Sequence, residues 1–375
     1  MTVRVNKPSL NIREKLSELE RPIGLKGGEI MAADTAQEAR ELVSAGRKNM
    51  IINGAMLISQ RYSSAQSIPS GSQPYFLDRF SNRNNTDASA SVSHSSEAPD
   101  GFYRSMRIEV TSPDTSLASN QYMRFQQYIE GHNMFCDWGV GNTDYVTLSF
   151  WVRSSLPGIY SASLEDGDAI PLHIKEYEID NADTWEYKTL TFPPPPTGTF
   201  RTAGTSTGMR LTMVQSSGTQ NQSSPNNWKT GSYYHASTNQ VNFVGQTGNF
   251  YITGIQLEVG KNATEFEHRS YGEELALCKR YYQRMGDTNT NEIVLGGYSV
   301  NGSNIYHSIQ LPVEMRIVPT LSQVGTFYSV RTNQPGSLSG HRGRKGFGVA
   351  HTTTQDGNFL LASNTTAYFV LDAEL

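Results

Sequence analysis

The sequence predicts a mainly β protein: an antiparallel jelly-roll β-sandwich with a short helical N-terminal segment, one linker helix and a small C-terminal β-region. Two observations predict this fold. From about residue 50, apolar and polar residues alternate in short segments, which is the period of a half-buried strand. Loops rich in Gly, Ser, Asn and Pro separate these segments, and almost no helical pattern lies between them, which is typical of all-β architectures.

The first fifty residues follow a helical pattern instead. Two capping boxes, at residues 11–14 and 35–38, each begin a short amphipathic helix, and the first helix must end before Pro22. Helices this short bury too little surface to be stable alone, so we expect the segment to need another copy of the chain or another protein. The residues that we assign to attachment and oligomerisation are Leu10, Ile12, Leu16, Leu19, Leu42 and Val43.

The strands of the sandwich are predicted in order along the chain. Alternation marks residues 106–110, 148–152, 187–192, 209–213 and 251–259. In the last of these segments, the residues expected to share one face are Tyr251, Thr253, Ile255, Leu257 and Val259. The polar residues 60–99 are expected to form a loop with one strand at 75–80. The prolines at 193–196 end the strand before them, because proline cannot donate to a strand ladder.

A capping box at residues 270–273 begins the linker helix. Apolar residues at helical spacing from Leu275 to Met285 predict that the helix continues to a left-handed cap at Gly286. Beyond it, strand-like segments lie at 292–298, 305–311, 320–330 and 368–375. The predicted domains are residues 1–48, 49–270 and 271–375.

Composition excludes several classes of function. The formal net charge is −4, so the chain as a whole lacks the positive field of a nucleic-acid or anionic-membrane binder. Two cysteines, Cys136 and Cys278, cannot form a disulfide framework or a four-ligand zinc site, and we expect both to be buried. No apolar stretch approaches the ~18 residues of a membrane span, and the start lacks a signal-peptide core. We therefore expect a soluble protein that is made in a cytoplasm and needs no cofactor.

Several segments, taken in their order along the chain, carry a resemblance to a known family. They are residues 48–56 with Gln60 and Arg61, 149–154, 183–191, 251–260, 265–282, 311–316 and 372–375. The series resembles bacteriophage tail-fibre and related virion structural proteins that contain a carbohydrate-binding-module-like jelly roll. This resemblance covers residues 48–375. Residues 3–19 are similar to the amino-terminal segment of structural proteins from marine podoviruses.

The resemblance implies a homotrimeric or otherwise multicopy virion component, synthesised in the bacterial cytoplasm and often attributed to host-surface recognition. Its partners would be other virion proteins, bound through the N-terminal segment, further copies of itself and a host-surface glycan, with no nucleic acid and no membrane insertion. It implies no catalytic residue set. A head or capsid-surface fibre with a purely structural role is the alternative to a tail fibre, and a polysaccharide depolymerase is a third. The loops 63–96, 156–172 and 332–348 fall outside the resembling segments, so no ligand is implied for them.

Carboxylates are the candidates for an enzyme, because glycoside hydrolysis uses two of them about 5–10 Å apart. No spacing marks a pair, so we expect no enzymatic activity. The carboxylates considered are Asp137, Asp144, Glu165, Asp166, Asp168, Glu176 and Glu178. Residues 165–168 also look like part of a calcium loop, but they lie between strands, which favours a hairpin turn. Further along, we expect Phe266 to pack into the core and His268 or Arg269 to bond at the start of the following helix.

Aromatic and basic residues are the candidates for glycan or receptor contacts. Sugars stack their C–H faces on flat rings, while amides and charged groups bind their hydroxyls. We expect Trp151 and Trp185, which lie in strands, to pack in the framework. Three fixed positive charges within residues 340–346 form either a solvated hairpin tip or a contact for anionic groups. The candidate contacts are Trp138, Trp228, Tyr233, Tyr234, Arg342, Arg344 and Lys345.

Overall fold

The computed structural model divides into two units, residues 1–48 and residues 49–375. The residues that it describes are 47–167, 171–196, 200–201, 203–229, 235–286, 294–299, 304–325, 327–329, 342–352, 357–363 and 367–375. The predicted N-terminal helices therefore lie outside the described residues. So do the candidate residues Leu10, Ile12, Leu16, Leu19, Leu42, Val43, Tyr233 and Tyr234.

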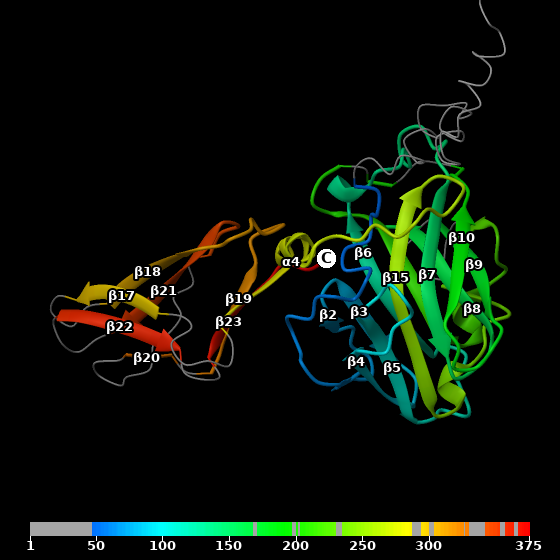
Figure 1. Ribbon diagram of the computed structural model, residues 1–375, viewed down its shortest axis with the longest axis horizontal. Helices are drawn as coiled ribbons and strands as arrows, with labels where there is room; N and C mark the ends of the chain where they lie inside the picture. The colour runs from blue at the N-terminus through cyan, green and yellow to red at the C-terminus, as the bar shows by residue number, and fades with distance from the viewer. Residues whose placement is uncertain are drawn as a thin grey trace, which may run out of the picture. The chain divides into compact units, whose positions relative to one another are not determined.

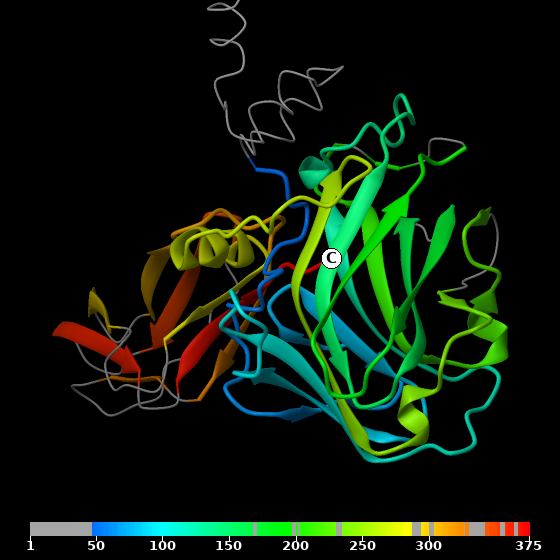
Figure 2. The same cartoon turned by 45° about the vertical axis from the view of Figure 1, so that its right-hand side comes forward.

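Two antiparallel sheets form the sandwich, which confirms the predicted fold class (Figures 1 and 2). The six-stranded sheet contains, in spatial order, β1 (Gln66–Ser67), β4 (Ser89–Ser95), β5 (Ser105–Ser112), β15 (Gly248–Val259), β7 (Val146–Ser154) and β10 (Glu186–Phe192). The seven-stranded sheet contains β13 (Trp228–Lys229), β9 (Leu172–Ile179), β8 (Gly158–Asp166), β11 (Thr207–Ser217), β6 (Tyr122–Glu130), β3 (Phe80–Asn84) and β2 (Tyr75–Leu77). Shorter elements are the parallel pair β12 (Gln222–Ser223) and β14 (Ala236–Ser237), and the 3-10 helices η1 (Gly131–Asn133), η2 (Thr219–Asn221) and η3 (Phe243–Gly245).

The core lies between the two sheets and follows the predicted alternation. Leu148, Phe150 and Val152 of β7 are fully buried in it. From the other sheet, Leu211 and Met213 of β11 meet them. Successive side chains of a strand point to opposite faces, so the intervening residues of each strand lie on the outer face of their sheet. The same alternation predicts which side chains a ligand could reach, namely those on the outer faces of the sheets.

Two segments expected to be loops contain strands. Residues 60–99 hold β1, β2, β3 and β4 rather than one strand. In β4 the small residues Ala90 and Val92 face the core while serines occupy the outer positions, so a polar composition concealed a regular alternation. Likewise β8 occupies most of the loop expected at 156–172.

A β-bulge in β15 corrects the predicted facing of that strand. Its pairing with β7 shifts register between Thr253 and Gln256, and Gly254 adopts a left-handed φ of 63°. Phe250 and Ile252 therefore face the core before the bulge, and Ile255 and Leu257 face it afterwards. Tyr251 and Thr253, expected on the same face as Ile255, lie on the outer side.

The linker helix α4 (Tyr271–Lys279) is shorter than predicted. Its capping box is present, because the Ser270 hydroxyl accepts from the Glu273 amide and the Glu273 carboxylate accepts from the Ser270 amide. The helix ends at Lys279 rather than near Met285, and the chain continues as β16 (Tyr282–Met285). Tyrosine favours strands, and β16 satisfies its backbone groups by pairing with β23 (Tyr368–Asp372), which residue spacing alone does not reveal.

Small antiparallel sheets form the C-terminal β-region. Besides β16 and β23, they contain β17 (Val294–Ser299), β18 (Asn304–Gln310), β19 (Thr320–Val324), β20 (Phe327–Ser329), β21 (Gly346–Thr352) and β22 (Gly357–Ser363). The single strand expected at 320–330 is thus two strands, β19 and β20. Among the described side chains, Phe327 stacks on Phe369 at 4.2 Å between ring centroids, and Phe347 meets Phe369 edge-on at 5.3 Å.

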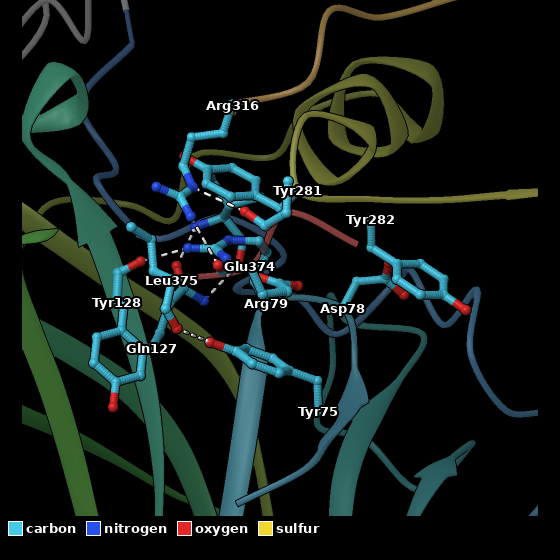
Figure 3. Close-up of polar contacts among 12 residues, drawn as sticks. Tyr75, Asp78, Arg79, Gln127, Tyr128, Tyr281, Tyr282, Arg316, Glu374 and Leu375 are labelled. Atoms are coloured by element: carbon cyan, nitrogen blue, oxygen red, sulfur yellow. Dashed lines mark hydrogen bonds and ion pairs between the residues drawn. The ribbon is translucent and has the colours of Figure 1, made fainter. Parts of the chain in front are cut away.

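Three arginines hold the segment that begins at the last residue of β23, and we call Arg61, Arg79, Arg316 and the segment they hold, residues 372–375, the arginine junction. Figure 3 shows Arg79 and Arg316 beside Glu374. The Arg79 guanidinium donates to the Glu374 carboxylate and to the Tyr128 carbonyl, and it lies 3.5 Å from the centroid of the Tyr281 ring. Arg79 occupies a left-handed φ of 72° in the turn between β2 and β3, a conformation that its several partners maintain.

The other two arginines complete the junction. Arg61 pairs with Asp372 and with Glu374 at 3.0 Å each. Arg316 donates to the carbonyls of Ala373 and Glu374 at 2.8 Å each. Because a buried charge is tolerated only when it is paired and hydrogen-bonded, this network ties the segment tightly to the sandwich.

Candidate functional site

Four aromatic side chains lie on the outer face of the six-stranded sheet, and we call Trp151, Trp185, Tyr187 and Tyr251 the aromatic face. In β7, Leu148, Phe150 and Val152 face the core, so Trp151 points outward. Trp151 is directly opposite Tyr187 of β10 on one side and Thr253 of β15 on the other. The bulge in β15 places Tyr251 on the same outer surface, opposite Arg153.

The rings of the aromatic face are accessible from solvent to different degrees. Tyr187 is 44% exposed, whereas Trp151 and Trp185 are half-buried and Tyr251 is buried. Trp151 lies 5.4 Å from Tyr187 and Trp185 lies 6.1 Å from Tyr251, both between ring centroids and in tilted arrangements. Each tryptophan is thus supported by a tyrosine and keeps part of its surface free for a partner.

Polar groups surround these rings in fixed positions. The Arg153 guanidinium lies 5.4 Å from the centroid of the Tyr251 ring and donates to Glu97 at 3.2 Å. Next to it, Arg107 donates to the Asn249 amide oxygen at 2.8 Å and pairs with Glu109 at 2.7 Å. Rings that offer flat apolar surface, next to charged and amide groups already oriented by each other, suit a ligand with C–H faces and hydroxyls.

The outer face of the seven-stranded sheet carries a polar cluster instead, consisting of the partly exposed Arg210 and the buried residues Arg124, Gln126, Glu165, Thr212 and His235. Its members lie on neighbouring strands at matching positions, so Thr212 is opposite both Gln126 and Ser163. Gln126 donates to the Thr212 hydroxyl at 2.7 Å, and that hydroxyl donates to Glu165 at 3.1 Å. Arg210 donates to the same Glu165 oxygen at 2.5 Å.

Glu165 is ionised in this cluster. Burial opposes ionisation, but His235 and the Arg210 guanidinium, which both face the carboxylate, outweigh burial and hold the pKa of Glu165 well below its usual range. Burial lowers the pKa of His235, whose Nδ1 lies 3.5 Å from Glu165. A carboxylate held in this way by an arginine is a poor general acid, so the cluster does not resemble the acid of a glycosidase.

The other carboxylates considered from the sequence hold their own loops. Asp137 accepts hydrogen bonds from the backbone amides of Thr143 and Asp144 at 3.0 Å. Glu176 accepts from Asn239 at 2.8 Å and from the Ser237 hydroxyl. Glu165 and Asp166 are the last residues of β8 and lead into the turn toward β9, as the hairpin prediction states; Asp168 lies outside the described residues.

Trp138 is a core residue, and its assignment as a glycan contact is wrong for the folded chain. The indole is fully buried and donates from Nε1 to the Asp144 carbonyl at 2.7 Å. Its ring meets Phe200 at 5.1 Å and Trp228 at 5.4 Å. The surrounding amides and glycines suggested an exposed loop, but these residues form a turn that closes over the ring.

Trp228 is partly buried and packs against the edge of the core. Its Nε1 donates to the Pro194 carbonyl at 3.0 Å, and its ring meets His173 edge-on at 5.2 Å. Burial, with the positive charge of Lys175 in addition, lowers the pKa of His173 to about 4. The packed part of the Trp228 ring fits a framework role, and the part that stays exposed is what a glycan could contact.

The three basic candidates lie together on a surface groove of about 1040 Å³ in the C-terminal β-region. Arg344 pairs with Glu314 at 2.8 Å, and Lys345 lies 3.8 Å from the same carboxylate. Arg342 is exposed. Glu314 therefore neutralises much of the positive charge that suggested an anion contact.

Of the two predictions for the residues just before α4, one is confirmed and one is wrong. Arg269 bonds at the start of the helix as expected, because it lies 3.4 Å from Glu274 and donates to the Asn49 carbonyl at 2.6 Å. Phe266 does not enter the core; it is half-buried and packs on Phe102 at 5.0 Å. Cys136 and Cys278 are both buried, as expected.

Two residues of the aromatic face, Trp151 and Trp185, are ones that the sequence analysis assigns to framework packing. The signal that could have found them is the alternation itself: if Phe150 and Val152 face the core, then Trp151 cannot. Tyr187 follows from the pairing of β10 with β7, and Trp185, which precedes β10, follows from its contact with the Tyr251 ring; no residue spacing reveals either.

Comparisons with known proteins add similar structures but no family. No family model and no curated protein matches the chain. Similar solved structures include the enzymatically active domain of a bacteriophage CBA120 tailspike protein, at 13% identity and a TM-score of 0.32, covering 56% of this chain and 21% of that one. A Bacteroides thetaiotaomicron protein, described as a candidate sugar-binding protein, is 11% identical with a TM-score of 0.32. The match covers 57% of this chain and 100% of that one. A family 11 carbohydrate-binding module of a Clostridium thermocellum cellulase is 10% identical with a TM-score of 0.26, covering 55% and 100%.

Two further properties hold for the part of the chain that the structure describes. No helix there is long and apolar enough to cross a membrane. No group of three or more His, Cys, Asp or Glu side chains among those residues is placed to hold a metal ion.

Proposed function

We propose that the protein is a non-enzymatic, carbohydrate-binding structural component of a bacteriophage particle. In this proposal it is a trimeric tail fibre that is attached through its N-terminal segment and presents the sandwich to a glycan of the host surface. The virion role rests on the resemblance of residues 48–375 to tail-fibre and related proteins. The binding role rests on the aromatic face.

The single observation that carries the binding role is the outward placement of Trp151, Trp185 and Tyr187. An outer sheet surface has no structural need for large rings, and exposed aromatic patches commonly mark binding sites. Their neighbours Arg107, Arg153 and Asn249 supply donors and an acceptor within the same surface. The proposed contact is therefore ring stacking on sugar C–H faces, with hydroxyls bound by the flanking polar groups.

Trimerisation strengthens such a contact without any new interaction. A shallow surface binds one sugar chain weakly, because a single open contact buries little area. Three copies on one fibre engage a repetitive surface polysaccharide together, and linked binding events raise the apparent affinity by roughly 100-fold or more. A fibre that must sample many host cells before committing benefits from contacts that are weak singly and strong together.

A glycan array probed with the full chain tests the binding role. We expect saturable binding to a subset of host-envelope polysaccharides, and the bound polysaccharide recovered afterwards at its original length. Absence of binding to every host glycan would favour the purely structural alternative. Shortened polysaccharide would identify a depolymerase and contradict the proposal.

Removal of residues 1–48 tests the virion role separately. We expect the truncated chain to fold, because residues 49–375 form a unit of their own, and to be missing from assembled particles. Particles that incorporate the truncated chain at the normal level would contradict attachment through this segment.

A further inference from the structure

A second site, which is concave and lined by residues other than those of the aromatic face, lies at the start of α4. It is a cavity of about 530 Å³, which lies within the range of roughly 300–1,000 Å³ typical of small-molecule sites. Phe102, Tyr103 and Tyr271 supply its aromatic walls, and Ala55 and Leu57 add aliphatic surface. We call it the Phe102 pocket. Neither the sequence motifs nor the aromatic face accounts for it.

The wall of the pocket is built by the same bulge that reorients β15. Gly254 adopts a φ of 63°, and a Cβ at this position would lie 2.7 Å from the Phe102 ring. The absence of a side chain therefore lets the ring sit directly on the strand. Phe266 meets Phe102 edge-on at 5.0 Å, and the His268 ring lies 5.4 Å from Phe102. These contacts fix the orientation of the ring before any ligand arrives.

The mouth of the pocket is open and aromatic. Tyr103 is 83% exposed and Tyr271 is 60% exposed, the two highest values among the described tyrosines. A tyrosine ring held at the surface beside a cavity offers a flat apolar face and a hydroxyl to the same partner.

The polar lining of the pocket is basic. Besides the aromatic residues it contains His94, Arg104, His268 and Arg269, and none of its described lining residues is Asp or Glu. Arg269 is engaged elsewhere, with Glu267 at 2.7 Å. Arg104 is exposed and makes no hydrogen bond or ion pair with any residue that the structure describes.

His94 adds a second fixed polar group. Its Nε2 lies 2.6 Å from the Met56 carbonyl, so Nε2–H donates to that oxygen and Nδ1 is left to accept. Burial lowers the pKa of His94, with Arg104 adding to the effect, which keeps the ring neutral near pH 7. The pocket thus combines an unpaired guanidinium with a neutral imidazole acceptor.

We propose that the Phe102 pocket binds one acidic sugar residue, a hexuronate in which Arg104 pairs with the carboxylate. The size suits a single pyranose ring, the aromatic walls suit its C–H faces, and the His94 acceptor suits a hydroxyl. Charge complementarity selects the acid over the neutral sugar, because a guanidinium pairs with a carboxylate through two parallel hydrogen bonds. This inference goes beyond the aromatic face and does not depend on it.

Methyl β-D-glucuronide and methyl β-D-glucoside test the proposal directly, because they share one ring and differ in the carboxylate. Both are titrated against the full chain and followed by ligand-observed NMR. We expect the glucuronide to bind at least fivefold more tightly. Arg104→Gln should remove this preference, and Tyr103→Ala should weaken both ligands; both side chains are exposed, so neither change threatens the fold.

Two control variants keep this test separate from that of the aromatic face. Arg342→Gln, an exposed arginine in the C-terminal β-region, should leave the preference unchanged. Tyr187→Ala should weaken the aromatic-face contact yet leave glucuronide binding intact. Equal binding of the two glycosides, no binding of either, or a preference that survives Arg104→Gln would each overturn the proposal.

Discussion

Beside the aromatic face and in the arginine junction alike, an arginine packs on a tyrosine ring and pairs with a glutamate, but the two environments are very different. Beside the face, Arg153 lies 5.4 Å from the centroid of the Tyr251 ring with its side chain 25% exposed. In the junction, Arg79 lies 3.5 Å from the centroid of the Tyr281 ring with its side chain 1% exposed.

This difference in exposure separates binding from stability. A solvent-exposed ion pair contributes little to folding, because water screens it and its side chains lose entropy. A buried arginine that loses its carboxylate leaves an uncompensated charge, which is strongly destabilising. We therefore expect changes on the face to alter ligand binding and changes in the junction to alter the free energy of unfolding.

The largest expected effect comes from removing the carboxylate of the junction. Glu374→Gln keeps the shape of the side chain but takes the charge from between Arg61 and Arg79. We expect the free energy of unfolding to fall by about 3–5 kcal/mol, measured by urea denaturation. The matched change on the face, Glu109→Gln, removes one partner of Arg107 and should cost less than about 1 kcal/mol. Equal losses of stability in the two variants would contradict the claim that burial sets the cost of removing a carboxylate.

The second expected effect is a loss of stability in acid, because a histidine that is buried without a charge binds its proton more readily once the chain unfolds. His173 is neutral in the folded chain, with a pKa of about 4, whereas an unfolded histidine binds its proton near pH 6.5. Between these values the unfolded state binds more protons, so stability falls as pH drops from 6.5 to 4. The contribution of His173 is about 3 kcal/mol at most.

His173→Gln tests this directly. The variant should lose stability less steeply between pH 6.5 and 4 in urea titrations at a series of pH values. His94 and His235, whose pKa values burial also lowers, leave part of the decline in place. His132→Gln, the same substitution at an exposed histidine, is the control for the change of residue type. A His173→Gln profile that is parallel to the unmodified one would contradict the assignment.

A smaller effect is expected at the bulge that turns Tyr251 outward. Gly254→Ala places an alanine in a left-handed backbone conformation, which costs about 1–2 kcal/mol of stability. It also presses a methyl group against the Phe102 ring. Gly71→Ala has a similar φ of 79° with no atom within 4 Å of the added carbon, so it pays only the backbone cost. We expect Gly254→Ala to lower the unfolding midpoint in urea more than Gly71→Ala does; the reverse order would show that the Phe102 ring yields freely.

Much of the architecture follows from alternation, and the failures have identifiable causes. The strands that contain Met106, Phe150 and Leu211 are correctly predicted, since inward residues there are large and apolar. The sequence does not predict β4, because its inward residues are as small as Ala90. In β15 the bulge at Gly254 changes which alternate residues face the core, so the prediction of uninterrupted alternation is wrong across the bulge.

The site was predicted less well than the fold, because tertiary pairing decides exposure. Trp138, surrounded by loop-forming residues, is buried by a turn that no local pattern announces. Trp151 and Trp185 were assigned to the framework because large rings usually serve there. The Phe102 pocket joins residues near 55, 94, 102 and 270, and only the folded chain brings these together.

The most direct test of the central claim is the affinity of the full chain for the polysaccharide identified on the array, measured for two tyrosine variants. Tyr187→Ala removes a ring of the aromatic face that is 44% exposed, and Tyr62→Ala removes one elsewhere that is 41% exposed. We expect a loss of about tenfold in affinity, or ~1.4 kcal/mol, for Tyr187→Ala and no loss for Tyr62→Ala. Unchanged affinity in Tyr187→Ala, with the polysaccharide still bound, would show that the glycan binds elsewhere.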